Sequence, residues 1–271
     1  MFQVAIYGKG GIGKSTMSAN ISVTLSNMGK DVMQVGCDPK HDSTRLLLNG
    51  NTQTTVLDYL RNTPIAKRRL EDIAIKGTNG ILCIEAGGPE PGIGCAGRGI
   101  LSTFEALGKL GADDLDIDYK IYDVLGDVVC GGFAVPLRNE YADSVILVTS
   151  GEFMSIYAAN NILKGLLNFG STPRVAGLIL NSRGMNSEYQ MVERFSEAAG
   201  IPILAVIPRS PLFSQAESLG HTVCELYPDS DAARSVASIA TSILDISEGR
   251  RNMHAARPLN DVQMSDIAAG R

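Results

Sequence analysis

The chain has 271 residues, 44% of them hydrophobic, and a formal net charge of -5 at pH 7. No linker rich in Pro, Gly or Ser divides it, so we expect one domain over residues 1–248 and an extended or mobile C-terminal tail over 249–271. The acidic balance argues against a nucleic-acid surface, and no apolar run is long enough for a membrane span. No secretory signal pattern opens the chain, so we expect a cytoplasmic protein that binds neither nucleic acid nor membrane.

A phosphate-loop pattern follows the first apolar run, Val4–Tyr7, and precedes a helix-like run over 16–28. Its closely spaced glycines let backbone N–H groups turn onto phosphate oxygens, and its lysine and serine can reach the phosphates and Mg²⁺. The start of the following helix adds a partial positive charge. The pattern therefore predicts a nucleotide site. Its residues are Gly8, Lys9, Gly10, Gly11, Ile12, Gly13, Lys14, Ser15 and Thr16.

The rest of the chain alternates strand-like and helix-length segments. After the first strand we expect strands at 32–36, 81–85, 119–122, 144–149, 174–180 and 203–207, and helices at 16–28, 55–61, 100–110, 153–169, 187–199 and 231–247. This alternation predicts an α/β fold, a single-domain P-loop NTPase whose mostly parallel sheet has helices on both faces. Ligands bind such sheets at the carboxyl ends of the strands. The loops after the strands are therefore the candidate sites of chemistry.

Acidic residues follow two of the expected strands. Asp38 and Lys40 lie in the loop after the second strand, beside the phosphate loop, which favours a functional role over a simple turn. His41, in the same loop, is more typical of a hydrogen-bonding residue than of a catalyst. Asp123 closes the strand at 119–122 and is the expected second anchor of a Mg²⁺ shell. Asp127 is close enough to serve instead, or to position an attacking water, and the sequence leaves both roles open.

Five cysteines in a reducing compartment are not a disulfide framework. Cys95 and Cys130 lie in glycine-rich loops, whereas Cys83 is embedded in an apolar run and we expect it to be buried, as we do Cys37 and Cys224. A [4Fe–4S] cluster normally takes four thiolates, and a symmetric dimer would supply four from two such loops. A pair of structural cysteines is the alternative.

Several motifs together resemble the nitrogenase iron protein family. They are the phosphate loop with its two lysines, Gly36 to Lys40, Gly87 to Gly99, and Tyr122 to Ala134. The resemblance continues through Tyr157–Asn161 and Asn181–Arg183, and covers the chain from Met1 to about Glu217. It implies an ATP-hydrolysing oxidoreductase component. Such a component is a homodimer that binds MgATP and passes electrons from ferredoxin or flavodoxin, through one bridging [4Fe–4S] cluster, to a larger nitrogenase-like catalytic component.

The resemblance also implies roles for individual residues. Cys95 and Cys130 would ligate the cluster, and Ser15 and Asp123 would lie on the magnesium side of the nucleotide. Lys14 would bind phosphate, and Lys9 would reach the nucleotide of the other subunit. Asp38 and Asp127 would belong to two switch segments, with Asp127 orienting water. Arg98 would contact the catalytic partner and, in some members, is ADP-ribosylated. Lys40, Asn181, Pro208 and Arg209 would belong to the nucleotide site, with Asn181 at the adenine.

Departures from the family pattern widen the choice of partner. His41 stands where nitrogenase iron proteins usually carry alanine, and a histidine at this position is similar to the protein that serves dark protochlorophyllide reduction. The stretch from Cys95 to Arg98 instead resembles nitrogenase iron proteins. Ser210 replaces the aspartate that usually follows Pro208-Arg209. A nitrogenase-like reductase for methylthio-alkanes or a nickel tetrapyrrole is therefore as compatible as nitrogenase itself. The rival from another class is a cluster-free partition or positioning ATPase, which shares the loop with Lys9 and Lys14 but binds membrane or DNA.

Overall fold

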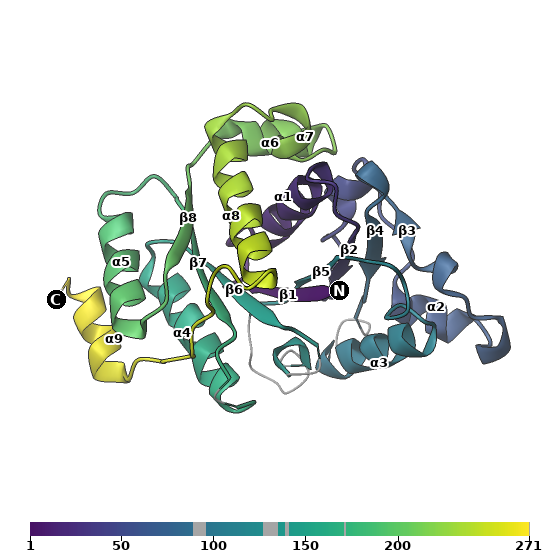
Figure 1. Ribbon diagram of the computed structural model, residues 1–271, viewed down its shortest axis with the longest axis horizontal. Helices are drawn as coiled ribbons and strands as arrows, with labels where there is room; N and C mark the ends of the chain where they lie inside the picture. The colour runs from purple at the N-terminus through teal and green to yellow at the C-terminus, as the bar shows by residue number, and fades with distance from the viewer. Residues whose placement is uncertain (89–95, 127–134, 139–140, 171, 271) are drawn as a thin grey trace.

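The computed structural model describes residues 1–88, 96–126, 135–138, 141–170 and 172–270. Within them, one eight-stranded sheet has the order β3-β4-β2-β5-β1-β6-β7-β8 (Figure 1). The strands are β1 Phe2–Tyr7, β2 Val32–Gly36, β3 Ile75–Lys76, β4 Leu82–Glu85, β5 Tyr119–Asp123, β6 Ser144–Thr149, β7 Val175–Asn181 and β8 Ile203–Ile207. All neighbours pair in parallel except β3, which is antiparallel to β4. The predicted fold class is thereby confirmed.

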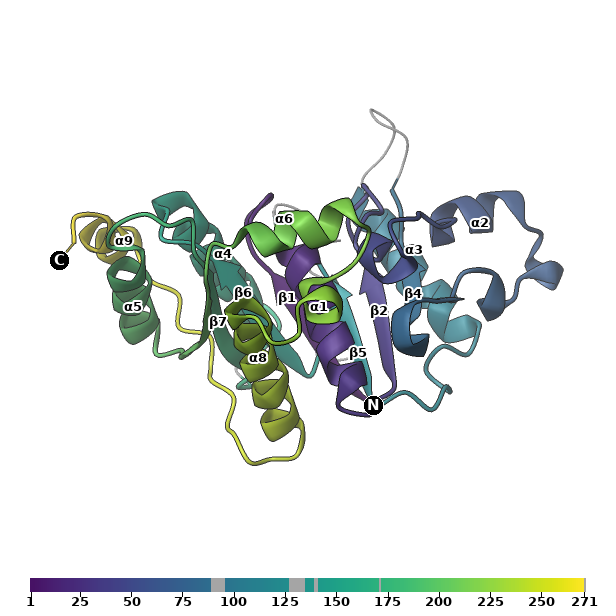
Figure 2. The same cartoon turned by 90° about the horizontal axis from the view of Figure 1, so that it is seen from above.

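Helices cover both faces of the sheet (Figures 1 and 2). They are α1 Lys14–Asn27, α2 Val56–Asn62, α3 Ala96–Lys109, α4 Phe153–Leu167, α5 Glu188–Ala199, α6 Pro211–Ser218, α7 Val223–Leu226, α8 Asp231–Ser247 and α9 Asp261–Ala268. Short 3-10 turns lie at Arg45–Leu48, Ile65–Lys67, Leu70–Asp72, Thr78–Gly80 and Val135–Leu137. One apolar core packs α1, α6, α7 and α8 on the sheet, and a second core packs α2, α3, α4, α5 and α9 on the opposite face.

The central strands form because most of their residues are apolar and can be buried. All six residues of β6 and all five of β2 are buried, as expected for parallel strands covered on both faces. α8 instead shows helical spacing, with Val236, Ile239 and Ile243 buried on one side. Its first turn is fixed by the Ser230 hydroxyl, which accepts a hydrogen bond from the Ala233 N–H at 3.1 Å.

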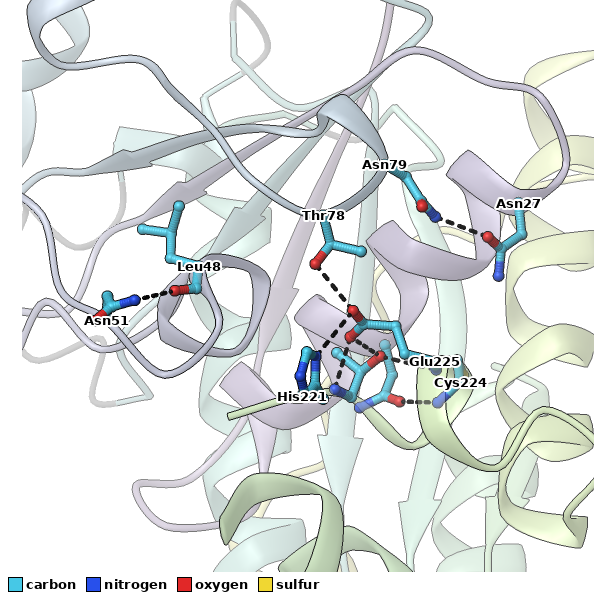
Figure 3. Close-up of polar contacts among 10 residues, drawn as sticks. Asn27, Leu48, Asn51, Thr78, Asn79, His221, Cys224 and Glu225 are labelled. Carbon is cyan, nitrogen blue, oxygen red and sulfur yellow. Dashed lines mark hydrogen bonds and ion pairs between the residues drawn. The ribbon is translucent and has the colours of Figure 1, made fainter. Parts of the chain in front are cut away.

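Two short helices, α6 and α7, were not among the predicted elements. Polar contacts fasten α7 to the turn before β4 and to α1 (Figure 3). The Thr78 hydroxyl donates to Glu225 at 2.9 Å, and the Cys224 N–H donates to Asn20 at 3.1 Å. Thr222 and Glu225 cap α7 reciprocally, with Glu225 accepting from both the backbone N–H and the hydroxyl of Thr222. These contacts hold α7 against α1 and against the turn before β4.

The C-terminal segment, expected to be extended or mobile, is packed onto the domain. His254 forms a bridge with Val175 at the start of β7, and the Asn160 side chain exchanges two hydrogen bonds with the backbone of Leu259, at 2.9 and 2.7 Å. α9 follows and buries Met264 and Ile267 in the same core as α5. The apolar positions of this segment are few and widely spaced, so its sequence pattern alone did not indicate packing. None of the described helices is long and apolar enough to cross a bilayer.

Candidate functional site

The carboxyl ends of β1, β2 and β5 meet at one edge of the sheet, where Asp123 pairs in register with Ile6 on one side and Gly36 on the other. A cavity of about 270 Å³ opens there. Its lining includes the predicted residues Gly10, Gly11, Gly13, Lys14, Ser15, Thr16, Asp38 and Lys40, together with Asp42, Ser43, Arg45, Leu46, Leu125 and Glu217. The structure therefore brings the phosphate loop and the loop after β2 together around one space.

Close backbone packing shapes the phosphate loop. Gly8 has φ 155°, and a Cβ there would lie 2.2 Å from the Val148 carbonyl oxygen of β6. On the other side, a Cβ on Gly126 would lie 1.9 Å from the carbonyl oxygen of Gly8. Glycine is required at both positions because backbone occupies the side-chain space. The loop is thus held between β6 and the segment that follows β5, and the Lys14 ammonium donates to the Lys9 carbonyl at 3.1 Å.

Asp123 has the surroundings of a magnesium-side carboxylate. It is 2% exposed, and among the described residues neither of its carboxylate oxygens has a hydrogen-bond partner of ordinary geometry. Burial raises its pKa, while the nearby Ser15 hydroxyl and Lys14 ammonium oppose that rise. A buried carboxylate with unused lone pairs beside a serine hydroxyl suits a hard cation such as Mg²⁺. Asp123 and Ser15 therefore fit the predicted Mg²⁺ shell.

The loop after β2 is polar at its tip and buried at its base. Asp38 accepts a hydrogen bond from the Lys40 N–H at 2.9 Å. His41 is exposed, has φ 47°, and its Nδ1 lies 3.1 Å from the Pro39 carbonyl oxygen, a turn geometry that fits the hydrogen-bonding role expected for it. At the base, Ser43 is 1% exposed, and the Gln34 side-chain amide donates to its carbonyl at 2.9 Å.

Sequence reasoning missed Glu85, at the end of β4. Its Oε1 accepts hydrogen bonds from the Thr44 N–H at 2.6 Å and the Thr44 hydroxyl at 2.7 Å. Burial raises the pKa of Glu85 to about 8, and the two hydrogen bonds from Thr44 oppose this rise. The available signal was a carboxylate closing the apolar run 81–84, the same signal that singled out Asp123.

Side chains from the ends of β7 and β8 hold the phosphate loop from the other side. The Asn181 amide donates to the Ile12 carbonyl at 2.7 Å, and the Arg183 guanidinium donates to the Gly11 carbonyl at 2.8 Å. Arg209, which follows Pro208, donates in turn to the Arg183 carbonyl at 2.8 Å. These contacts are with loop backbone, so the adenine contact of Asn181 stays a prediction. Arg183 belongs to the Asn181–Arg183 motif, but no local sequence pattern indicates its contact with Gly11.

Asp127, Cys95 and Cys130 fall outside the described residues. Arg98 is exposed in the first turn of α3. The thiols expected to be buried are so: Cys37, Cys83 and Cys224 are all buried and free.

A glycine-rich loop that joins the first strand of a parallel sheet to a helix, with a buried aspartate ending the adjacent strand, defines a P-loop NTPase. Solved structures share this fold. The septum site-determining protein MinD from Pyrococcus horikoshii OT3, complexed with Mg-ADP, is 22% identical with a TM-score of 0.72, over 92% of this chain and 98% of that chain. A ParA family ATPase from Chlorobium tepidum TLS is 23% identical with a TM-score of 0.69, over 89% of this chain and 99% of that one.

The sequence defines the family more narrowly. Residues 2–269 match the family of 4Fe-4S iron sulfur cluster binding proteins, NifH/frxC family, and the chain belongs to that family. A nitrogenase iron protein from Methanospirillum hungatei is 52% identical over 248 residues, which are 90% of this chain and 88% of that protein. The expectation that the likeness ends near Glu217 is wrong, because the family match continues through α8 and α9.

Proposed function

We propose that the chain is the ATP-dependent reductase component of a nitrogenase or nitrogenase-like enzyme. Two copies form a homodimer, bind MgATP, and share one [4Fe–4S] cluster from which electrons pass to a larger catalytic component. The observation that carries this proposal is the family match over residues 2–269, which includes the phosphate loop and both glycine-rich loops with Cys95 and Cys130.

The nucleotide part of the proposal rests on the fit of the site. Lys14 and the loop N–H groups would bind the phosphates, while Ser15 and Asp123 would hold Mg²⁺. Asp38 and Lys40 line the same cavity and would sense the γ-phosphate side. Asp127 would orient the attacking water, and Lys9 would reach the nucleotide of the partner subunit. Asn181, Pro208 and Arg209 would complete the base side.

The cluster part rests on cysteine chemistry. Cys95 and Cys130 of each subunit would supply four thiolates, and the bound cluster would store one electron at low potential. Arg98, exposed at the start of α3, would contact the catalytic component. The electron source would be ferredoxin or flavodoxin. Within the chain, ATP binding would alter the segments after β2 and β5, and so change how the subunits present the cluster.

Anaerobic purification tests the proposal. We expect a brown dimer with about four irons, and loss of that iron in Cys95→Ala and Cys130→Ala. Cys83→Ala is the matched control, because Cys83 is a buried free thiol on β4. A colourless protein whose ATPase responds to DNA or lipid would contradict the proposal and favour the partition-ATPase alternative.

The catalytic partner is identified by reconstitution. The reduced protein is mixed with MgATP and, in separate reactions, with nitrogenase, methylthio-alkane reductase or tetrapyrrole reductase catalytic components, and product is assayed. Product that requires MgATP with one of these identifies the partner. Electron transfer that proceeds equally well without MgATP would contradict an ATP-dependent role.

A further inference from the structure

The loop that faces the phosphate cavity is bonded directly to the end of β4. Glu85 Oε1 accepts from both the backbone N–H and the hydroxyl of Thr44, at 2.6 and 2.7 Å, although the two residues are 41 positions apart. Thr44 directly follows Ser43, which lines the cavity. The carboxyl group of Glu85 is therefore one residue removed from the lining of the cavity.

Glu85 has no room to absorb such a movement. Its side chain is 1% exposed, and a Cβ built on Gly36 of β2 would lie 2.1 Å from Glu85 Oε2. That oxygen has no hydrogen-bond partner among the described residues. β4 itself is fixed beside β2, where Gly36 and Glu85 pair in register and the Ala86 N–H donates to the Gly36 carbonyl at 2.8 Å. The carboxyl group is thus clamped, and its position follows the strand end.

The residues after Glu85 touch the same loop a second time. A Cβ on Gly88 would lie 2.6 Å from Pro39 Cβ, so Gly88 packs directly on the tip of the loop after β2. On the other side, the Leu57 N–H of α2 donates to the Ala86 carbonyl at 3.2 Å. Residues 85–88 therefore lie between the nucleotide-facing loop and α2, and they lead in sequence toward Cys95 seven residues later.

We propose that Glu85 is a positioning residue that couples the nucleotide-facing loop to the start of the Cys95 segment through its two hydrogen bonds with Thr44. The functional role of this coupling rests on the proposed function, because a link to the Cys95 segment affects electron transfer only if Cys95 holds a cluster. The coupling itself is a property of the described residues. It runs through residues 85–88, which continue from the end of β4, and is separate from the segment that leads from Asp123, at the end of β5, toward Cys130.

Hydrogen–deuterium exchange on the purified dimer tests the coupling. In the wild-type protein, MgADP and a magnesium complex of a non-hydrolysable ATP analogue should each change exchange in peptides covering 36–47 and 82–88. In Glu85→Ala the response of 36–47 should persist and that of 82–88 should be lost. Glu85→Gln keeps an oxygen that accepts both bonds and should restore the response, and Thr44→Val, which keeps the N–H donor, should give a reduced one.

Glu225 supplies a matched control. It accepts from the backbone N–H and hydroxyl of Thr222 at 2.8 and 2.7 Å, the same pairing that Glu85 makes with Thr44, but on α7 (Figure 3). Glu225→Ala should leave both nucleotide responses as in the wild type. A purely structural role for Glu85 would disturb exchange in 82–88 with and without nucleotide and keep the difference between them.

Three results would overturn the proposal. These are an unchanged response of 82–88 in Glu85→Ala, no response of 82–88 in the wild type, or the same loss in Glu225→Ala. If Glu85→Ala does not fold, a full wild-type response in Thr44→Val would overturn it, whereas a reduced one would support it. Iron content separates the two hypotheses: a wild-type dimer without iron refutes the cluster, while the exchange result still decides the coupling.

Discussion

Replacing Glu85 by Gln tests the electrostatic state of the carboxyl group below the nucleotide-facing loop. The pKa of Glu85 is raised from 4.5 to about 8, mainly by burial and also by the carboxylates of Asp123 and Asp42, while the Thr44 hydrogen bonds oppose the rise. At pH 7 the side chain is therefore a neutral acid in the folded protein and a carboxylate in the unfolded chain. Gln imitates the neutral acid, since both are uncharged and carry an acceptor oxygen and a donor group in nearly the same space.

The magnitude follows from the proton that Glu85 takes up on folding. Because the folded pKa is the higher one, its favourable contribution is complete below pH 4.5 and is lost as the pH rises to about 8. Within that window, each pH unit lowers the free energy of unfolding of the wild type by up to about 1.4 kcal/mol, whereas a Gln at position 85 adds no such pH dependence. Because the slope flattens near the two pKa values, the free energy of unfolding of Glu85→Gln relative to wild type should rise by about 3.5 kcal/mol between pH 5 and pH 8.

Urea unfolding of the nucleotide-free protein, followed by circular dichroism at intervals from pH 5 to pH 9, measures this difference. Glu225→Gln makes the same chemical change on α7 and supplies the background to subtract. The difference between Glu85→Gln and wild type should grow with pH and level off above about pH 8. A difference that is constant, or that shrinks as pH rises, would refute a raised pKa for Glu85.

Three further substitutions test the site and the tail. Gly126→Ala places a Cβ 1.9 Å from the Gly8 carbonyl oxygen and should abolish nucleotide binding in calorimetry, whereas Gly108→Ala, with its nearest neighbour at 3.5 Å, should bind normally. Asp123→Asn should weaken the binding of MgATP at least tenfold, or ~1.4 kcal/mol, and should weaken the binding of metal-free ATP, measured in EDTA, much less. Equal losses of affinity for the two forms would exclude a magnesium role for Asp123. Asn160→Ala removes two buried hydrogen bonds to the tail and should lower the free energy of unfolding in urea by about 2–4 kcal/mol. Limited proteolysis should then release the tail. An unchanged urea midpoint would contradict this expectation.

The fold was predictable where burial imposes a simple pattern. The predicted bounds of β6 and α8 agree with the structure, because a buried parallel strand is mostly apolar and a half-buried helix is apolar at helical spacing. The phosphate loop was predictable because glycine, lysine and serine are each required at fixed positions between a strand and a helix. α7 was not predicted, since it is four residues long and depends on capping by Thr222 and Glu225.

Contacts between distant residues could not be read from the sequence. The Arg183 guanidinium supports the carbonyl of Gly11 across 172 positions, and Asn160 binds the tail across 99. No local pattern specifies such pairs, because each depends on which strand ends lie side by side. The acidic residues at strand ends were visible in sequence, yet Asp123 received a role and Glu85 did not. The difference was the expectation of Mg²⁺ rather than any difference in pattern.

The order of the strands places Asp123 and Glu85 on either side of the same loop. β2 lies between β4 and β5, so the loop that follows β2 borders both strand ends at once. β5 leads through Asp123 toward Cys130, and β4 leads through Glu85 toward Cys95. We therefore expect this one loop to act on both segments that lead in sequence to the cysteines. If the coupling is shared in this way, Glu85→Ala should uncouple the β4 side while the MgATP response of residues 119–126 persists, and loss of both responses would show that the two paths are not independent.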